Sequence, residues 1–146
     1  MPLEPGNIVE EADAFVEIEG AQALIDWLGF VPTFHDARLT EIELISSRSG
    51  RLRLEAFRRT DQTDEKGHFI LDRHAFVTLT LNDISTVQLE HFAKVGIVNR
   101  LRITNAGKRY RLQWDSSYGA EGCITAGNLS INFEPSHSDR AGGDAA

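Results

Sequence analysis

The segment from Val31 to Leu39, VPTFHDARL, places an aromatic side chain, a histidine and a carboxylate at consecutive positions. A histidine beside an aspartate can supply two metal ligands. A metal site needs a third protein ligand, which could be His68, His74 or His91. A metal- or ligand-binding enzyme that uses His35 and Asp36 is therefore one interpretation of this segment, although the spacing matches no known ligand pattern.

Strand geometry favours a structural role for the same two side chains. Successive strand residues point to opposite faces, so His35 and Asp36 converge on one ion only where the backbone is irregular. We therefore expect the Asp36 carboxylate to accept hydrogen bonds from backbone N–H groups of the turn after Pro32, and His35 to bond to a neighbouring strand. On this interpretation the chain has no catalytic, cofactor-binding or metal-binding residue and needs no cofactor.

Other patterns that carry chemistry are incomplete. The acidic stretch 61–66, DQTDEK, lacks the central glycine and final glutamate of a calcium loop, which predicts a solvated hairpin tip. Ser116 and Ser117 stand outside the G-x-S-x-G context of a nucleophilic serine. Cys123 has no CxxC partner, and no glycine-rich run has the setting of a phosphate-binding loop. Nucleophilic catalysis thus has no support in the sequence.

The charge is acidic and unevenly distributed. The 146 residues include 22 acids and 15 Lys or Arg, for a net charge of -7, and residues 1–37 hold eight of the acids and no Lys or Arg. Phosphate backbones and anionic lipids attract basic proteins, so neither nucleic acid nor a membrane surface is the expected partner. The single cysteine and the acidic N-terminal segment predict a cytoplasmic protein.

The elements that position these residues form one predicted α+β domain over residues 1–134. Ala21, Leu24 and Leu28 recur at helical spacing before Gly29, which predicts a helix over 21–28 packed on one face of a sheet. A capping-box pattern predicts a short helix over 8–14, and the alternation over 16–19 is also compatible with a short edge strand. The polar tail, residues 135–146, has nothing to bury, and we expect it to be disordered.

Beyond Ala37 the hydrophobic period changes to two residues, which predicts about seven meandering strands. Short connections require an antiparallel sheet. The expected strands centre on 42–44, 52–56, 77–81, 87–89, 101–103, 110–114 and 124–133, the last being either a strand pair or one long bent strand. The predicted core includes Leu24, Leu28, Phe34, Leu79, Leu112 and Trp114.

With the preceding Leu28 and Gly29, VPTFHDARL resembles the G-x-W-P-S-F-H-D-A-E-V signature of the immunity protein 50 family, from bacterial polymorphic toxin systems. The likeness covers about residues 15–134 and returns in the SYG segment 117–119. Val31 stands where the family usually has Trp, Arg38 where it has Glu, and residues 96–99 lack the usual Gln-Asn pair. The family-motif residues, which we expect to be structural, are Pro32, Phe34, His35, Asp36, Ala37, Ser117, Tyr118 and Gly119.

This resemblance implies a small antidote that binds a cognate protein toxin and blocks it without catalysis. An acidic inhibitor would associate quickly with a basic toxin that acts on nucleic acid. The acidic side chains expected to border the toxin-binding surface are Glu10, Glu11, Asp13, Glu17 and Glu19. The second alternative is a homodimeric structural protein, whose mark would be a large, self-complementary apolar patch.

Overall fold

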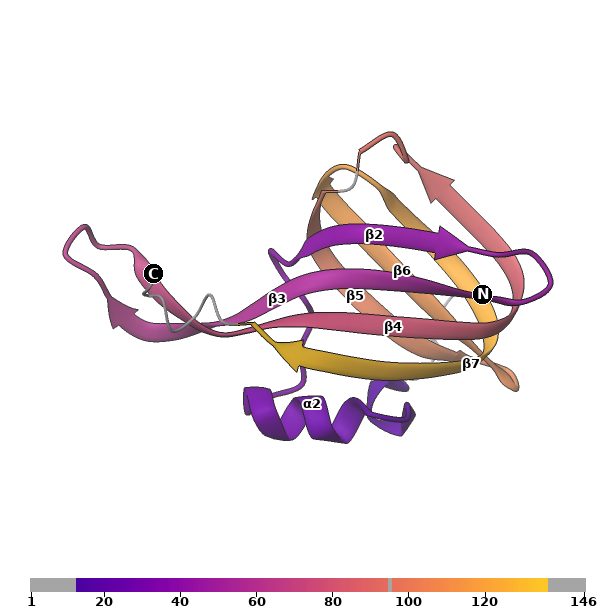
Figure 1. Cartoon of the computed structure of the whole chain (residues 1–146), viewed down its shortest axis with the longest axis horizontal. Coiled ribbons are helices and arrows are strands. Elements are labelled where there is room, and N and C mark those ends of the chain that lie inside the picture. The colour runs from indigo at the N-terminus through magenta and orange to yellow at the C-terminus, as the bar shows by residue number, and fades with distance from the viewer. Residues whose placement is uncertain (1–12, 95, 137–146) are drawn as a thin grey trace, which may run out of the picture.

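A computed structural model describes residues 13–94 and 96–136, which form a barrel with one α-helix beside it (Figure 1). The elements are the 3₁₀-helix η1 (Phe15–Glu17), the helix α2 (Ala21–Leu28) and the strands β2 (Arg38–Leu44), β3 (Ser49–Thr63), β4 (Phe69–Glu90), β5 (Ile97–Ala106), β6 (Arg109–Tyr118) and β7 (Glu121–Pro135). All strand pairs are antiparallel, and the barrel closes in the order β2-β3-β4-β7-β6-β5. The expected α+β chain dominated by an antiparallel sheet is confirmed.

The described residues form six strands and not seven, because Asn82 and Asp83 do not end a strand. β4 runs through both residues and pairs with β7 on either side of them. Asp83 has a φ of 58°, and the β4–β7 register shifts between Ile84 and Thr86. Turn-forming residue types indicate a local change in chain direction, and here they produce a bulge that bends one long strand. At the C-terminal end, β7 is one long strand, the second of the two forms expected there.

The N-terminal segment differs from both forms expected for it. Residues 8–12 of the predicted first helix lie outside the described residues. Residues 15–17 form η1 and not an edge strand, because Phe15 and Ile18 are buried three positions apart while Val16 is exposed. Within the described residues, the β-type backbone pairing of this segment consists of two isolated bridges, Asp13 to Thr104 and Glu19 to Ser130.

Helix α2 has the predicted bounds and covers the hydrophobic core beside β7 (Figure 1). Gly29 ends it with a φ of 95°, and its N–H donates to the Ile25 carbonyl at 2.7 Å. The ring of Trp27 packs against that of Phe133, with centroids 5.3 Å apart. All six residues predicted for the core are buried: Leu24, Leu28, Phe34, Leu79, Leu112 and Trp114.

The end of β7 lies just beyond the predicted domain boundary at residue 134. Pro135 pairs with Ala75, and the Ser136 N–H donates to the His74 carbonyl at 2.8 Å. Residues 137–146 of the predicted tail lie outside the described residues. Within the described part, no helix combines the length and apolar character needed to cross a membrane.

Past the last pair with β7, β3 and β4 continue as a two-stranded arm that extends from the barrel, residues 57–73 (Figure 1). The hairpin expected around the tip 61–66 is present, but residues 61–63 belong to a strand, because β3 continues to Thr63, and β4 begins at Phe69. The tip is a turn in which the Asp64 carboxylate accepts hydrogen bonds from the N–H groups of Lys66 and His68. Neither edge of the arm pairs with a third strand within the described residues.

Candidate functional site

The chain between α2 and β2 turns sharply at the FHDA segment. Phe34 and Asp36 both have left-handed backbone conformations, with φ of 63° and 68°, and the Ala37 N–H donates to the Phe34 carbonyl at 3.0 Å. Phe34 is buried, and its ring lies 6.2 Å from that of Phe15. Non-glycine residues seldom adopt a positive φ, so tertiary contacts must hold this turn in place.

The expectation for His35 is confirmed, and the one for Asp36 is wrong. His35 Nδ1 lies 2.9 Å from the Asn99 carbonyl oxygen of β5, a hydrogen bond between FHDA and a neighbouring strand. The Asp36 carboxylate accepts no backbone hydrogen bond from the described residues; it is exposed, and its contact is His35 Nε2 at 3.6 Å. Asp36 contributes its backbone instead, since its N–H donates to the Val98 carbonyl at 2.8 Å. Aspartate suits this position because it tolerates the left-handed conformation better than most residues.

The SYG segment meets the same part of β5 from the other side. Ile97 pairs with Tyr118, and the backbones of Gly96 and Gly119 pack closely, because a Cβ added to Gly119 would lie 2.8 Å from the Gly96 Cα. The Lys94 side chain donates to the Tyr118 hydroxyl at 2.8 Å, and the Lys94 carbonyl accepts from the Ala120 N–H at 2.7 Å. Gly119 has a φ of 94°, which few residues other than glycine adopt.

The two motif segments therefore meet where the barrel closes, a region that we call the seam: residues 34–39, 94, 96–99 and 116–120. The β2–β5 ladder has one residue pair, Arg38 with Ile97. Backbone hydrogen bonds extend this contact on both sides of that pair: FHDA bonds to Val98 on one side, and on the other the Leu39 N–H donates to the Gly96 carbonyl at 2.7 Å. The backbone of both motif segments thus takes part in closing the barrel, and a structural role for the motif residues as a set stays a prediction.

A metal site on His35 and Asp36 lacks its third ligand among the described residues. His68 lies 3.9 Å from Asp64 at the tip of the arm, and the His74 ring packs against Phe57. In the described part of the chain, the group of three possible ligands that comes together is Glu90, His91 and Glu121. Of the histidines considered with the FHDA segment, His91 thus joins two acids that the sequence did not single out.

Beside FHDA the surface is hollowed and apolar. A cavity of about 360 Å³ is lined by residues of the α2–β2 connection, including Phe30 and His35, and by Phe57 and Leu71 of the arm. Phe30 and Leu71 are exposed hydrophobic residues that line this cavity. The exposed Val31 follows Phe30 in the chain, and the exposed Phe69 shares a face of β4 with Leu71. We call these four side chains, with the cavity, the corner surface. The guanidinium of Arg59, which also lines the cavity, lies 4.7 Å above the Phe69 ring.

An ion pair fixes the base of the arm next to the corner surface. Arg58 donates two hydrogen bonds to the Asp72 carboxylate, at 2.9 and 2.7 Å, and a third to the Leu28 carbonyl at 3.2 Å. The Leu28 carbonyl belongs to the last turn of α2, where backbone acceptors lack helical partners. The hydrogen bonds from Arg58 lower the pKa of Asp72 below its ordinary value, with a further contribution from the guanidinium charge. This pair therefore sets the arm against the end of the helix.

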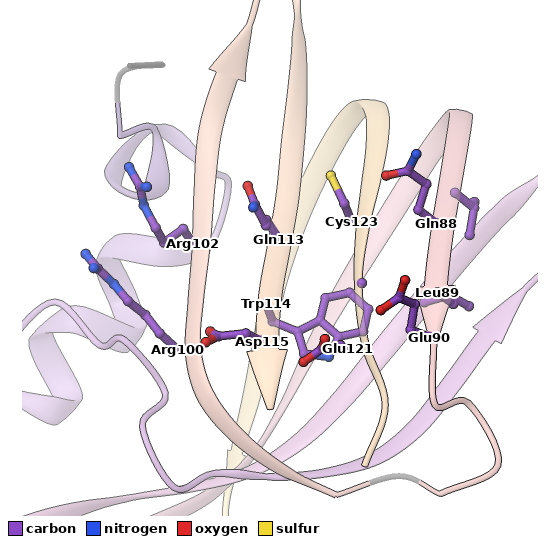
Figure 2. Close-up of a pocket in the computed structure, with 12 residues that line it drawn as sticks. Gln88, Leu89, Glu90, Arg100, Arg102, Gln113, Trp114, Asp115, Glu121 and Cys123 are labelled. Atoms are coloured by element: carbon purple, nitrogen blue, oxygen red, sulfur yellow. The ribbon is translucent and has the colours of Figure 1, made fainter. Parts of the chain in front are cut away.

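A hollow of about 860 Å³ lies across β5, β6, β7 and β4 (Figure 2). Arg100 and Arg102 of β5 line one side, and Glu90 of β4 lines the other. Cys123 lies between them on β7, directly opposite Gln113 of β6 and Gln88 of β4. No described histidine lines this hollow with Cys123.

Of the acidic residues expected to border a partner surface, Asp13, Glu17 and Glu19 are exposed. Asp13 also has a local role, because its carboxylate accepts a hydrogen bond from the Phe15 N–H at 3.0 Å. Glu10 and Glu11 lie outside the described residues.

Two features of the surface escaped the sequence interpretation. The apolar run 69–71 was a detectable signal for the corner surface, since three hydrophobic residues follow the polar hairpin tip. The meeting of Glu90 with Glu121 left no comparable signal, because it depends on pairing between β4 and β7, which are not consecutive strands.

The chain matches no family model and no curated protein. Among solved structures, it is similar to the crystal structure of an uncharacterized protein from Neisseria gonorrhoeae, with 17% sequence identity and a TM-score of 0.42. That alignment covers 70% of this chain and 94% of the other.

Proposed function

We propose that this protein is a cytoplasmic immunity protein that binds a cognate protein toxin through the corner surface and neutralises it without catalysis. The proposal starts from the resemblance of residues 28–39 and 117–119 to the immunity protein 50 family. The observation that carries it furthest is the corner surface, which joins exposed apolar side chains and a cavity beside that motif.

The composition of the corner surface suits a protein partner. Phe30, Phe69 and Leu71 are each more than one-third exposed, and aromatic side chains next to an arginine are enriched where protein interfaces derive their binding energy. Arg59 adds a polar group at the edge of this apolar area. The unpaired edges of the arm also present backbone N–H and C=O groups to which an extended segment of a partner can hydrogen-bond.

The acidic N-terminal quarter supports fast association with a basic toxin. Exposed charges around an interface act mainly on the association rate, because they steer the encounter while remaining solvated. Reversing Glu17 and Glu19 to Lys should slow association and weaken its dependence on salt, with little change in dissociation. Equal association rates for the wild type and the double variant would refute a role of these acids in association, but not toxin binding through the corner surface.

The direct test is co-expression of the chain with the toxin domain encoded by a neighbouring gene. We expect growth to be rescued and the two proteins to purify as a complex. A Phe30→Ser/Leu71→Ser variant should lose both rescue and complex formation, because it removes apolar contact area from the corner surface. Phe92→Ser is the matched control, since Phe92 is an exposed aromatic residue away from the corner surface.

Three outcomes separate this proposal from its alternatives. Complete failure of the wild type to rescue growth or to bind would refute the pairing. Equal loss in the control variant would refute the assignment of the corner surface. If the free protein is a dimer and the Phe30→Ser/Leu71→Ser variant is a monomer, the structural homodimer is the better interpretation.

A further inference from the structure

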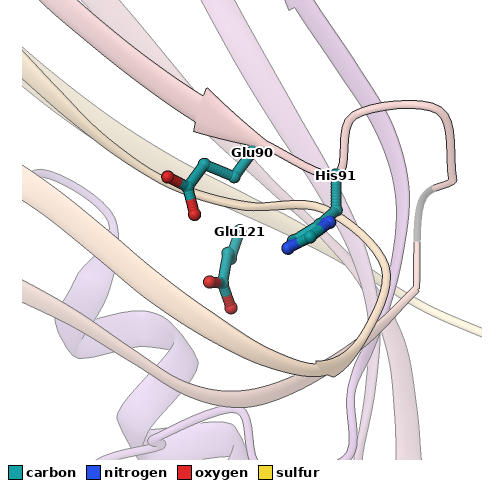
Figure 3. A group of neighbouring side chains, drawn as sticks. All are labelled: Glu90, His91 and Glu121. Carbon is teal, nitrogen blue, oxygen red and sulfur yellow. The ribbon is translucent and has the colours of Figure 1, made fainter.

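The group formed by Glu90, His91 and Glu121 lies at the end of the barrel where β4 finishes and β7 begins (Figure 3). Each residue offers one ligand atom, and these three atoms all lie within 4.8 Å of one another. Figure 3 shows the two carboxylates and the imidazole extending into the same space. Glu90 and His91 are exposed and Glu121 is half-buried, so solvent reaches the group.

Without a bound cation, the carboxylates of Glu90 and Glu121 repel each other. Glu90 and Glu121 are direct partners in the β4–β7 ladder, and like charges directly opposite each other destabilise a sheet. Neither forms an ion pair with a Lys or Arg among the described residues. Lys94, the nearest base along the chain, donates its hydrogen bond to Tyr118. A bound cation would remove this repulsion.

The orientation of Glu121 is already fixed by a neighbour. Its Oε1 accepts a hydrogen bond from the Ser116 N–H at 3.1 Å, which leaves Oε2 and a lone pair of Oε1 for a ligand. Carboxylates that bind a metal commonly also accept a hydrogen bond from a neighbouring group, which fixes their orientation. Zinc binds nitrogen and oxygen ligands at about 2.0–2.2 Å, so tetrahedral ligands stand about 3.4 Å apart. The exposed side chains of Glu90 and His91 can rotate to close the remaining distance.

We propose that Glu90, His91 and Glu121 form a binding site for a divalent transition-metal ion, with Zn²⁺ as the expected ion among those tested below. One imidazole and two carboxylates match the ligands of Zn²⁺, whereas Ca²⁺ and Mg²⁺ prefer oxygen ligands alone. Three protein ligands leave a coordination position for water. Glu121 lines both the 860 Å³ hollow and a second hollow of about 470 Å³ that includes His91, so this position is accessible to small ligands.

The test is isothermal titration of chelator-treated, tag-free protein with ZnCl₂, followed by MgCl₂ and CaCl₂ in separate experiments. We expect one equivalent of Zn²⁺ to bind at micromolar concentration, with weaker binding of Mg²⁺ and Ca²⁺. His91→Ala and Glu121→Gln should each reduce the Zn²⁺ affinity about tenfold or more, since even an outer-shell partner changes metal affinity by about 10- to 100-fold. Zn²⁺ should raise the melting temperature of the wild type but not of the variants.

Two control variants make the result specific to this group. His68→Ala removes an exposed histidine that lies 3.9 Å from an acid elsewhere, and Cys123→Ser removes the thiol that lines the larger hollow. Both should bind Zn²⁺ as the wild type does. Absence of Zn²⁺ binding, binding that survives His91→Ala, or Ca²⁺ binding as tight as that of Zn²⁺ would each overturn the proposal. Because no toxin is used, these outcomes are independent of the proposed function.

Discussion

Two glycines, Gly96 in the seam and Gly107 outside it, are expected to be required for different physical reasons, which single substitutions can separate. A Cβ on Gly96 would lie 1.8 Å from the Tyr118 carbonyl oxygen, although the φ of Gly96 is not positive. Gly107, in the β5–β6 turn, is the converse case, with a φ of 68° and no atom within 4 Å of an added Cβ. Gly96→Ala thus tests close approach alone, and Gly107→Ala tests backbone conformation alone.

The expected magnitudes follow from these two situations. A left-handed conformation costs an alanine about 1–2 kcal/mol, and the lower entropy of the unfolded chain returns about 0.4–1 kcal/mol, so Gly107→Ala should lose about 1 kcal/mol. Overpacking costs about 1–3 kcal/mol in cores where side chains can adjust. At Gly96 the obstacle is backbone of a paired strand, which cannot rotate away, so the loss should reach about 3 kcal/mol.

Equilibrium urea denaturation of the two variants and the wild type measures both losses. Gly119→Ala combines the two effects, because its φ is 94° and an added Cβ would lie 2.9 Å from the Gly96 nitrogen. Since Gly96 and Gly119 share one contact, the double variant should lose less than the sum of the single losses. A loss for Gly96→Ala no larger than for Gly107→Ala would refute the close packing that we assign to the seam.

Three other predictions concern the core, the FHDA turn and the base of the arm. Leu24→Ala and Trp114→Ala should each cost about 2–5 kcal/mol in denaturation, because both side chains are buried, and losses under about 1 kcal/mol would contradict this core. Asp36→Gly should be more stable than Asp36→Ala by about 0.5–1 kcal/mol, because the backbone there has a φ of 68°; the reverse order would contradict a left-handed backbone at this position. The pKa of Asp72 is lowered in the folded protein. Its contribution to stability is therefore present above its unfolded pKa of about 3.9 and is lost as the pH falls through the folded value. Asp72→Asn should flatten the acid side of a plot of melting temperature against pH.

Local patterns predicted the elements well. The helix over 21–28 depended on the spacing of Leu24 and Leu28 and on Gly29, all within one stretch of chain, and its bounds are confirmed. The predicted number of strands was wrong because of Asn82 and Asp83, since these residue types occur both in turns between strands and in bulges within one strand. Pairing with β7 decides between the two, and that pairing joins residues more than 40 positions apart.

The closure of the barrel was beyond local patterns for a related reason. The β2–β5 contact consists of one ladder pair and a few hydrogen bonds made by a turn with two positive φ angles. A bulky residue such as Phe34 rarely adopts a positive φ, so the surrounding contacts must hold its backbone in that conformation. His35 could be assigned to a neighbouring strand, whereas the identity of that strand as β5 required the whole topology.

The positions that match the family signature include both buried and exposed residues. Phe34 and Ala37 match it and are buried at the seam, Pro32 matches it and is buried just before the seam, and His35 and Asp36 match it and are exposed. Val31 and Arg38 depart from it, and both are exposed, Val31 on the corner surface and Arg38 in a surface ion pair with Glu55. The buried motif residues help to close the barrel. Under the proposed function a partner would contact exposed residues, so partner choice is to be sought at Val31, along the arm, and at the exposed His35 and Asp36, which line the cavity of the corner surface.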